Sequence, residues 1–387
     1  MEIYFDNAAT TPLDSQVLEA MLPYLGKHHG NPSSTHQYGR RAKDAVESAR
    51  NTIATLLHAS PEEIFFTSGA TEANNLALAG SIHTLRFRHF ITSPLEHDSV
   101  LKSLDFYRKN YQIRVSLVET DAWGRVNLGH LQYLLQKNPA SFVSLMHGNN
   151  EIGNLNDIEE IGSICRTYKA VFHSDTVQTL GKRRLNLSKV PVHFLVGSAH
   201  KFHGPKGIGF LYVNKQIHLQ PLMHGGSQEK SLRAGTENVA GIVGLSTALS
   251  LAYENLDDTQ KYLQKLKGYL IRRLKEIFPQ LTFNGDSDQQ DKSLPSIVNI
   301  GFPALGDRAL VDILNEKGIY VSGGSACSNL VEHGSHVLRQ LGRNLELENI
   351  RFSFSKYNTL AEVDYLVKIL SNLYEPQNIL HYVGVAK

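Results

Sequence analysis

A lysine in a loop of small residues lies near the middle of the chain, between two apolar runs. The loop, residues 198–209, contains Lys201 and separates residues 194–196 from residues 210–213. This pattern predicts a strand, a polar loop and a second strand. A lysine in such a loop can form an imine with a carbonyl cofactor once its pKa is lowered, because the neutral amine is the nucleophile. An isolated Ser-X-His-Lys segment is more often a solvated turn, so this motif alone predicts no activity.

Polar groups also follow four other apolar runs. In open α/β sheets, ligands bind beyond the carboxyl ends of the strands, where such groups would meet. The sequence therefore predicts one site that is built from residues 69–71, His97, residues 147–151, Asp175 with Gln178, and residues 198–201.

Two of these groups suggest the chemistry of a ligand. Residues 68–72 precede a helix expected to begin near Glu72, where backbone N–H groups and the helix dipole favour a phosphate. Asp175 ends a buried run and needs a partner, which a protonated pyridine nitrogen would provide. Each feature alone also fits an ordinary helix cap or a surface carboxylate. Together with Lys201, they favour a site for pyridoxal phosphate (PLP).

Apolar runs alternate with helical segments over most of the chain, which predicts a mostly parallel sheet covered by helices. Asp14 or Ser15 should cap a helix that ends near Leu25, and residues 40–57 carry the apolar stripe of an amphipathic helix. We expect strands at residues 64–67, 90–92, 113–118, 142–146, 170–173 and 194–196.

A rise in charge density near residue 256 predicts a domain boundary. A helix from about Gly241 leads there into a charged helix over residues 258–278, and short strands mixed with helices follow. We therefore assign residues 14–256 to a large α/β domain with the mostly parallel sheet. Residues 1–13 and 257–387 are assigned to a smaller α+β domain.

Charge and cysteine content exclude several kinds of protein. Lys and Arg number 39 and Asp and Glu 37, a net charge of +2 that argues against a nucleic-acid partner. Two cysteines, Cys165 and Cys327, predict no disulfide framework and fit a reducing cytosol. No closely spaced Cys/His set predicts a metal site. The apolar residues 239–253 are too few to span a membrane and predict a buried helix. We expect a soluble cytoplasmic protein.

The order and spacing of these motifs resemble the NifS/IscS-like cysteine desulfurases, within the class V, fold type I PLP-dependent enzymes. The similarity extends from Tyr4 to about Thr359 and implies a seven-stranded-type sheet in the large domain. Matching segments are residues 6–12, 30–34, 67–75, 96–97, 149–153, 175–178, 198–209, 225–238, 324–328 and 351–353.

The resemblance implies a role for each site residue. Lys201 would carry the PLP imine, Asp175 would pair with the pyridinium nitrogen, and His97 would stack on the ring and shuttle a proton. The other cofactor contacts would be Ala70, Thr71, Asn149, Gln178, Ser198 and His200. Thr236 is expected to reach the phosphate of the other subunit, which implies a homodimer with shared sites.

The resemblance also implies the substrate and the nucleophile. Arg351, with Asn149 and Asn7, would hold L-cysteine. Cys327 would take its sulfur, leaving alanine and a persulfide for an acceptor protein such as an Fe–S scaffold or a tRNA-thiolation enzyme. The interval after Cys327 matches the long-loop group of the family, which passes the persulfide directly to an acceptor. Cys165, among apolar neighbours in a helical segment, is expected to be a buried small hydrophobe.

Three other functions compete with this interpretation. A selenocysteine lyase would share the motifs, another class V aminotransferase would not need Cys327, and a weakly active scaffold would only dock sulfur acceptors. The chain also departs from the usual family pattern in a way that affects loop mobility, at Thr176, Ser227, Ala234 and Gly334.

Overall fold

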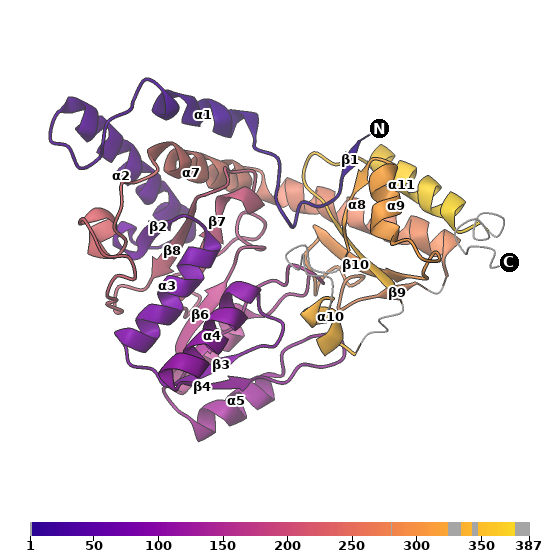
Figure 1. The fold of residues 1–387 in the computed structure, drawn as a ribbon, viewed down its shortest axis with the longest axis horizontal. Coiled ribbons are helices and arrows are strands. Elements are labelled where there is room, and N and C mark those ends of the chain that lie inside the picture. The colour runs from indigo at the N-terminus through magenta and orange to yellow at the C-terminus, as the bar shows by residue number, and fades with distance from the viewer. Residues whose placement is uncertain (1, 280, 324–333, 343–346, 376–387) are drawn as a thin grey trace.

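A seven-stranded sheet forms the centre of the larger part of the molecule (Figure 1). The computed structural model describes residues 2–279, 281–323, 334–342 and 347–375. The strand order is β2-β8-β7-β6-β5-β3-β4, and β8 runs antiparallel to both of its neighbours while the other pairs are parallel. The strands are β2 (Ile64–Thr67), β3 (His89–Thr92), β4 (Arg114–Leu117), β5 (Phe142–Ser144), β6 (Val171–Asp175), β7 (Phe194–Ser198) and β8 (Gly209–Val213).

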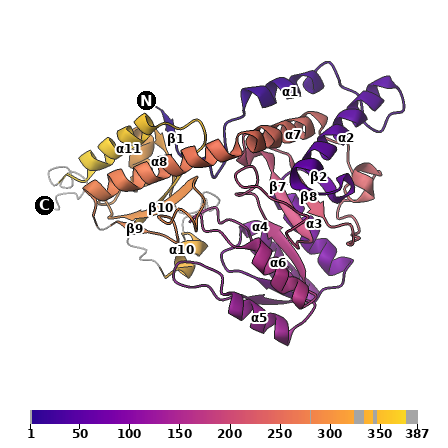
Figure 2. The same ribbon diagram turned by 180° about the vertical axis from the view of Figure 1, so that it is seen from behind.

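Successive residues of the central strands point into two different cores, because side chains alternate across a strand. Phe194 packs with α3 and α4 on one face, whereas Leu195 packs with α2, α5, α6 and α7 on the other (Figures 1 and 2). Both faces are therefore covered, as in parallel α/β sheets. The helices are α2 (Gln37–Leu57), α3 (Ala70–His83), α4 (Asp98–Tyr111), α5 (Leu128–Lys137), α6 (Ile158–Thr167) and α7 (Val239–Glu254).

The smaller part of the molecule has its own core. A four-stranded antiparallel sheet, β12-β13-β10-β9, packs with a parallel pair of β1 and β11. Its strands are β1 (Ile3–Tyr4), β9 (Thr282–Phe283), β10 (Ile297–Phe302), β11 (Ile319–Tyr320), β12 (Ser322–Gly323) and β13 (Glu348–Ser353). The remaining helices are α8 (Leu256–Ile277), α9 (Leu310–Glu316), α10 (His336–Gln340), α11 (Leu360–Leu373) and α1 (Ser15–Leu25). Of these, α1 packs in the core of the larger part, through Val17 and Met21.

The fold class predicted from the sequence is confirmed, with small differences at element ends. Helix α2 begins at Gln37, before the expected Arg40, because the His36 side chain accepts from the Gly39 N–H and caps it. Helix α3 begins at Ala70 rather than near Glu72. The boundary at residue 256 stays a proposal; it coincides with the break between α7 and α8.

Helix α7 is mostly buried, as expected for the apolar residues 239–253. Within the described ranges, no single helix is long and apolar enough to cross a membrane. Helices α7 and α8 reach that length and composition only as a pair, bent by 74°.

A buried ion pair holds the loop after β8 against the sheet. Glu229, Lys230 and Ser231 all have positive φ angles of 44°, 56° and 66°, a costly conformation for residues other than glycine. The Glu229 carboxylate accepts from both terminal nitrogens of Arg50 at 2.9 Å and from the Phe66 backbone N–H at 2.7 Å. These contacts fix the segment that leads to Thr236.

We expect Glu229→Ala to lower the free energy of unfolding by about 3 kcal/mol, because the buried Arg50 would lose its buried partner and keep only the exposed Glu47. Urea unfolding followed by circular dichroism measures this. The matched control is Glu316→Ala, which removes an exposed ion pair with Arg308 and should cost less than about 1 kcal/mol. Equal losses in the two variants would contradict the role given to the buried pair.

Candidate active site

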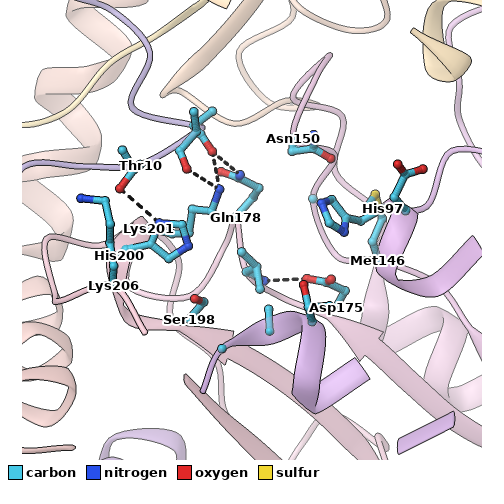
Figure 3. A pocket seen from close by; sticks show the side chains of 18 of the residues that line it. Thr10, His97, Met146, Asn150, Asp175, Gln178, Ser198, His200, Lys201 and Lys206 are labelled. Carbon is cyan, nitrogen blue, oxygen red and sulfur yellow. Dashed lines mark hydrogen bonds between the residues drawn. The ribbon is translucent and has the colours of Figure 1, made fainter. Parts of the chain in front are cut away.

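A cavity of about 620 Å³ lies at the carboxyl ends of the parallel strands (Figure 3). All five predicted polar groups contribute residues to its wall, together with residues 8–10 of the N-terminal segment. Lys206, His336 and Arg351 also line it, from other parts of the chain. The cavity lining that bears on the chemistry is Gly69, Ala70, Thr71, His97, Asn150, Asp175, Gln178, Ser198, His200 and Lys201.

Lys201 lies on a short 3₁₀ turn, Ala199–Lys201, directly after β7. Its Nζ donates to the carbonyl oxygens of Ala8 at 2.7 Å and Ala9 at 2.8 Å. The Gln178 amide also donates to the Ala8 oxygen, at 3.0 Å. The N-terminal segment therefore holds the lysine and the amide side by side in the cavity wall (Figure 3).

Asp175 ends β6 with its carboxylate buried in the same cavity. One oxygen accepts from the Asn74 amide at 2.9 Å and the other from the Val177 N–H at 3.0 Å. Burial, together with the Asp175 charge, raises the pKa of the neighbouring Glu96 well above its usual range. Asn74 was not singled out from the sequence, although it lies in a motif that carries the resemblance.

The opposite end of the cavity is rich in hydrogen-bond donors. The first residues of α3, Ala70 and Thr71, present the positive end of the helix to it. His200 contacts the Thr10 hydroxyl at 3.2 Å, and burial, with the charges of Lys201 and Lys206, lowers the pKa of His200 to about 4. His200 is thus neutral at pH 7. A helix N-terminus, a hydroxyl and two lysines suit a phosphate, and Asp175 suits a protonated ring nitrogen, so the residues fit PLP.

Arg351 reaches the cavity from β13 but is engaged within the chain. One terminal nitrogen donates to the Asp6 carboxylate at 2.6 Å and to the Ser322 hydroxyl at 2.9 Å, and the other donates to the Asn150 carbonyl at 2.9 Å. Its Nε has no hydrogen-bond partner among the described residues. Asp6 was not among the predicted site residues, because the ion pair joins distant parts of the chain.

Two of the predicted substrate contacts do not reach the cavity. The Asn149 amide donates to the Leu95 carbonyl, and its oxygen accepts from the N–H groups of residues 151 and 152. Asn7 is likewise buried and donates to the Ser353 carbonyl at 2.9 Å. Both side chains hold backbone turns whose next residues, Asn150 and Ala8, do line the cavity. Neither Asn149 nor Asn7 lines the cavity, and the contacts expected of them stay predictions.

One other predicted residue, Thr236, does not line the cavity. Thr236 lines a neighbouring hollow of about 140 Å³, and Ser68 and Gly207 belong to the walls of both. Cys327 lies outside the described residues. The chain is described again from residue 334, where His336 contacts the Glu96 carbonyl at 3.0 Å and Ser335 donates to Glu151.

Cys165 is fully buried in α6, as predicted. Burial raises the pKa of its thiol to about 12, so it carries no thiolate at neutral pH. In the ranges that the structure describes, no three His, Cys, Asp or Glu side chains are grouped to hold a metal ion.

The sequence matches the aminotransferase class-V family over residues 3–366. The chain therefore belongs to that family, a class of enzyme consistent with a lysine at the edge of this sheet.

Similar proteins within the family include cysteine desulfurases. Cysteine desulfurase IscS of Dictyoglomus turgidum is 40% identical over 378 residues, which cover 97% of this chain and 95% of that protein. A solved NifS-like protein superposes with a TM-score of 0.88 at 37% identity, covering 96% of this chain and 99% of that one. The solved structure of SspA in complex with cysteine superposes with a TM-score of 0.79 at 31% identity, covering 93% of this chain and 100% of that one. The resemblance to NifS/IscS-like cysteine desulfurases is confirmed.

The buried His147 beside the cavity should make the fold sensitive to acid. Its ring contacts the Thr179 hydroxyl at 2.9 Å, and burial, with the charge of Arg183, lowers the pKa of His147 to about 3. The unfolded state takes up a proton near its ordinary pKa of 6.5 and the folded state does not. The stability that the neutral His147 gives the fold is therefore fully present above pH 6.5 and is lost as the pH falls towards 3.

At pH 5 the loss from His147 should be about 2 kcal/mol relative to pH 7.5. Urea unfolding of the parent and of His147→Gln at both pH values tests this, since the variant should lose less stability between them. The surface substitution His218→Gln is the control and should leave the difference unchanged. A pH dependence identical in parent and His147→Gln would refute the assignment.

Proposed function

We propose that this protein is a PLP-dependent cysteine desulfurase, which converts L-cysteine to L-alanine and leaves its sulfur as a persulfide on Cys327. The observation that carries the proposal is the placing of Lys201 and Asp175 on one cavity, in a chain whose relatives are cysteine desulfurases. The relative SspA was solved in complex with cysteine, which supports the same substrate here.

PLP, when bound, supplies an electron sink for the α-carbon of an amino acid. Lys201 anchors the cofactor through Nζ and then moves the α-proton with the same nitrogen. Asp175, held by Asn74, keeps the ring nitrogen protonated. The α3 N-terminus, Ser198 and His200 line the cavity and would hold the phosphate, and Gln178, beside Lys201, would reach the phenolic oxygen.

His97 caps α4 and faces the same cavity. Its Nδ1 accepts from the Ser99 backbone N–H at 3.1 Å, which places the proton of the neutral ring on Nε2. With this orientation His97 stacks on the cofactor ring and carries a proton to or from the substrate sulfur. Arg351 takes the α-carboxylate, because a guanidinium can bind a carboxylate through two parallel hydrogen bonds.

In the sulfur step the Cys327 thiolate attacks the substrate sulfur. A sulfur–sulfur bond forms, the carbon–sulfur bond breaks, and its electron pair stays with the carbon skeleton. That carbon then takes up a proton, so alanine is the reduced product and the persulfide sulfur the oxidised one. No external oxidant or reductant is needed.

We further propose a cytoplasmic homodimer, in which Thr236 completes the phosphate site of the partner subunit. In this arrangement residues 14–256 form the cofactor domain, and residues 1–13 and 257–387 form the domain that carries the Cys327 loop. The persulfide passes to an acceptor protein, such as an Fe–S scaffold or a tRNA-thiolation enzyme. The IscS names of the relatives support an Fe–S scaffold as acceptor, and the sparse cysteines support the cytoplasmic location.

Purified protein should bind PLP covalently at Lys201. Borohydride reduction followed by peptide mapping should place the label there, because Lys201 lines the same cavity as Asp175. Lys206 is the matched alternative, since it lines the same cavity. Lys206→Ala should keep the label on Lys201, whereas a label on Lys206 in the parent would overturn the assignment.

The two cysteines should differ completely in sulfur transfer. Cys327→Ala should bind PLP and L-cysteine but form no persulfide, whereas Cys165→Ala should turn over normally with at most a modest loss of stability. Single-turnover reactions with labelled cysteine and mass spectrometry of the protein locate the sulfur. Sulfur on Cys165, or undiminished desulfuration by Cys327→Ala, would exclude the proposed reaction and favour an aminotransferase.

A further inference from the structure

A second, smaller cavity lies near the candidate active site and contains a lysine with no role in the mechanism above. It has a volume of about 100 Å³ and is lined by residues of α1, α7, α8 and the segment after β13. Lys182 contributes to its wall and does not line the active-site cavity. The lysine follows directly on the turn that carries Asp175 and Gln178.

Lys182 contacts the active site through one side chain. Its Nζ donates to the Gln178 amide oxygen at 3.3 Å, while the Gln178 amide nitrogen donates to the Ala8 carbonyl at 3.0 Å. Lys201 donates to the same carbonyl, at 2.7 Å. An ammonium can only donate and a carbonyl can only accept, so these partners determine which end of the Gln178 amide faces Ala8.

We propose that Lys182 is a positioning residue for the cofactor site: it orients the Gln178 amide, and its positive charge disfavours a proton on the Lys201 nitrogen. This inference rests on the proposed function, in which Lys201 binds PLP.

The charges around Lys182 support this role. Burial, with the positive charges of Lys201 and Arg351, lowers the pKa of Lys182 to about 7. Electrostatic interaction is mutual, so a charged Lys182 opposes protonation at Lys201 to the same degree. Asp14, the carboxylate in the second cavity, is bound by Lys356 and Tyr357. The other ionisable groups nearby are His200, His203 and Lys356, and burial lowers the pKa of His203 to about 4.

The test is a pH titration of the absorbance of PLP bound to Lys201 in the reconstituted holoenzyme, without substrate. Lys182→Met removes the charge and the donor at similar length, and it should raise the apparent pKa of the bound cofactor by about half a unit or more. Lys182→Arg keeps the charge and should shift it less. Should Lys182→Met not fold, Lys182→Gln replaces it with the same expected rise.

The matched control is Lys267→Met. Lys267 is also a buried lysine whose pKa burial lowers to about 7, but it donates to Ser293 and Leu294 in the smaller part of the molecule. The Lys267→Met variant should lose stability but leave the titration of the bound cofactor unchanged. If Lys182 had only a structural role, Lys182→Met would likewise lose stability and leave the titration of the bound cofactor unchanged.

Three outcomes would overturn the inference, or separate its failure from that of the proposed function. An unchanged titration in Lys182→Met with a full complement of PLP refutes the role of Lys182 alone. A shift in Lys182→Arg as large as in Lys182→Met refutes the charge argument. Absence of any PLP bound at Lys201 in the parent protein refutes the proposed function, and the inference with it.

Discussion

The site depends on a short N-terminal segment that is tied to both parts of the molecule. Strand β1 joins the smaller core through β11, and Asp6 binds Arg351 of β13. A few residues later the chain crosses to the large sheet, where the Thr11 N–H and hydroxyl both donate to the His200 carbonyl. The carbonyls between these anchors receive Lys201. The lysine of the large sheet is therefore positioned by backbone that the smaller core holds in place.

The electrostatics of the cavity follow from which groups keep their charge. His147 and His200 are neutral because burial lowers the pKa of each, and burial raises the pKa of the Glu96 carboxyl well above its usual range. Lys201, Lys206 and Arg351 therefore line the cavity together with Asp175, while Asp6 does not line it and pairs with Arg351. A ligand that carries a phosphate, a protonated ring nitrogen and a carboxylate complements this distribution.

The sequence allowed the layered fold and the edge of the sheet that carries the site to be predicted, because both follow from local patterns. Apolar runs mark the buried strands, and polar residues at their ends mark the edge that ligands reach. It could not show that Asn149 turns its amide back to Leu95, since that depends on the path of the following loop. The Asp6–Arg351 ion pair and the Lys182–Gln178 contact were also missed, because contacts between side chains leave no periodic signal.

The Asp6–Arg351 ion pair connects Arg351 to the N-terminal segment that holds Lys201. Arg351 is only 2% exposed, and its terminal nitrogens already bind Asp6, Ser322 and Asn150. A substrate carboxylate that binds Arg351 as proposed would use the Nε, which has no partner among the described residues, or would compete with the Asp6 carboxylate. Asp6 lies two residues before Ala8, whose carbonyl holds Lys201. Arg351, the proposed carboxylate-binding residue, and Lys201, the proposed cofactor lysine, are thus joined through three consecutive residues of the N-terminal segment, Asp6, Asn7 and Ala8.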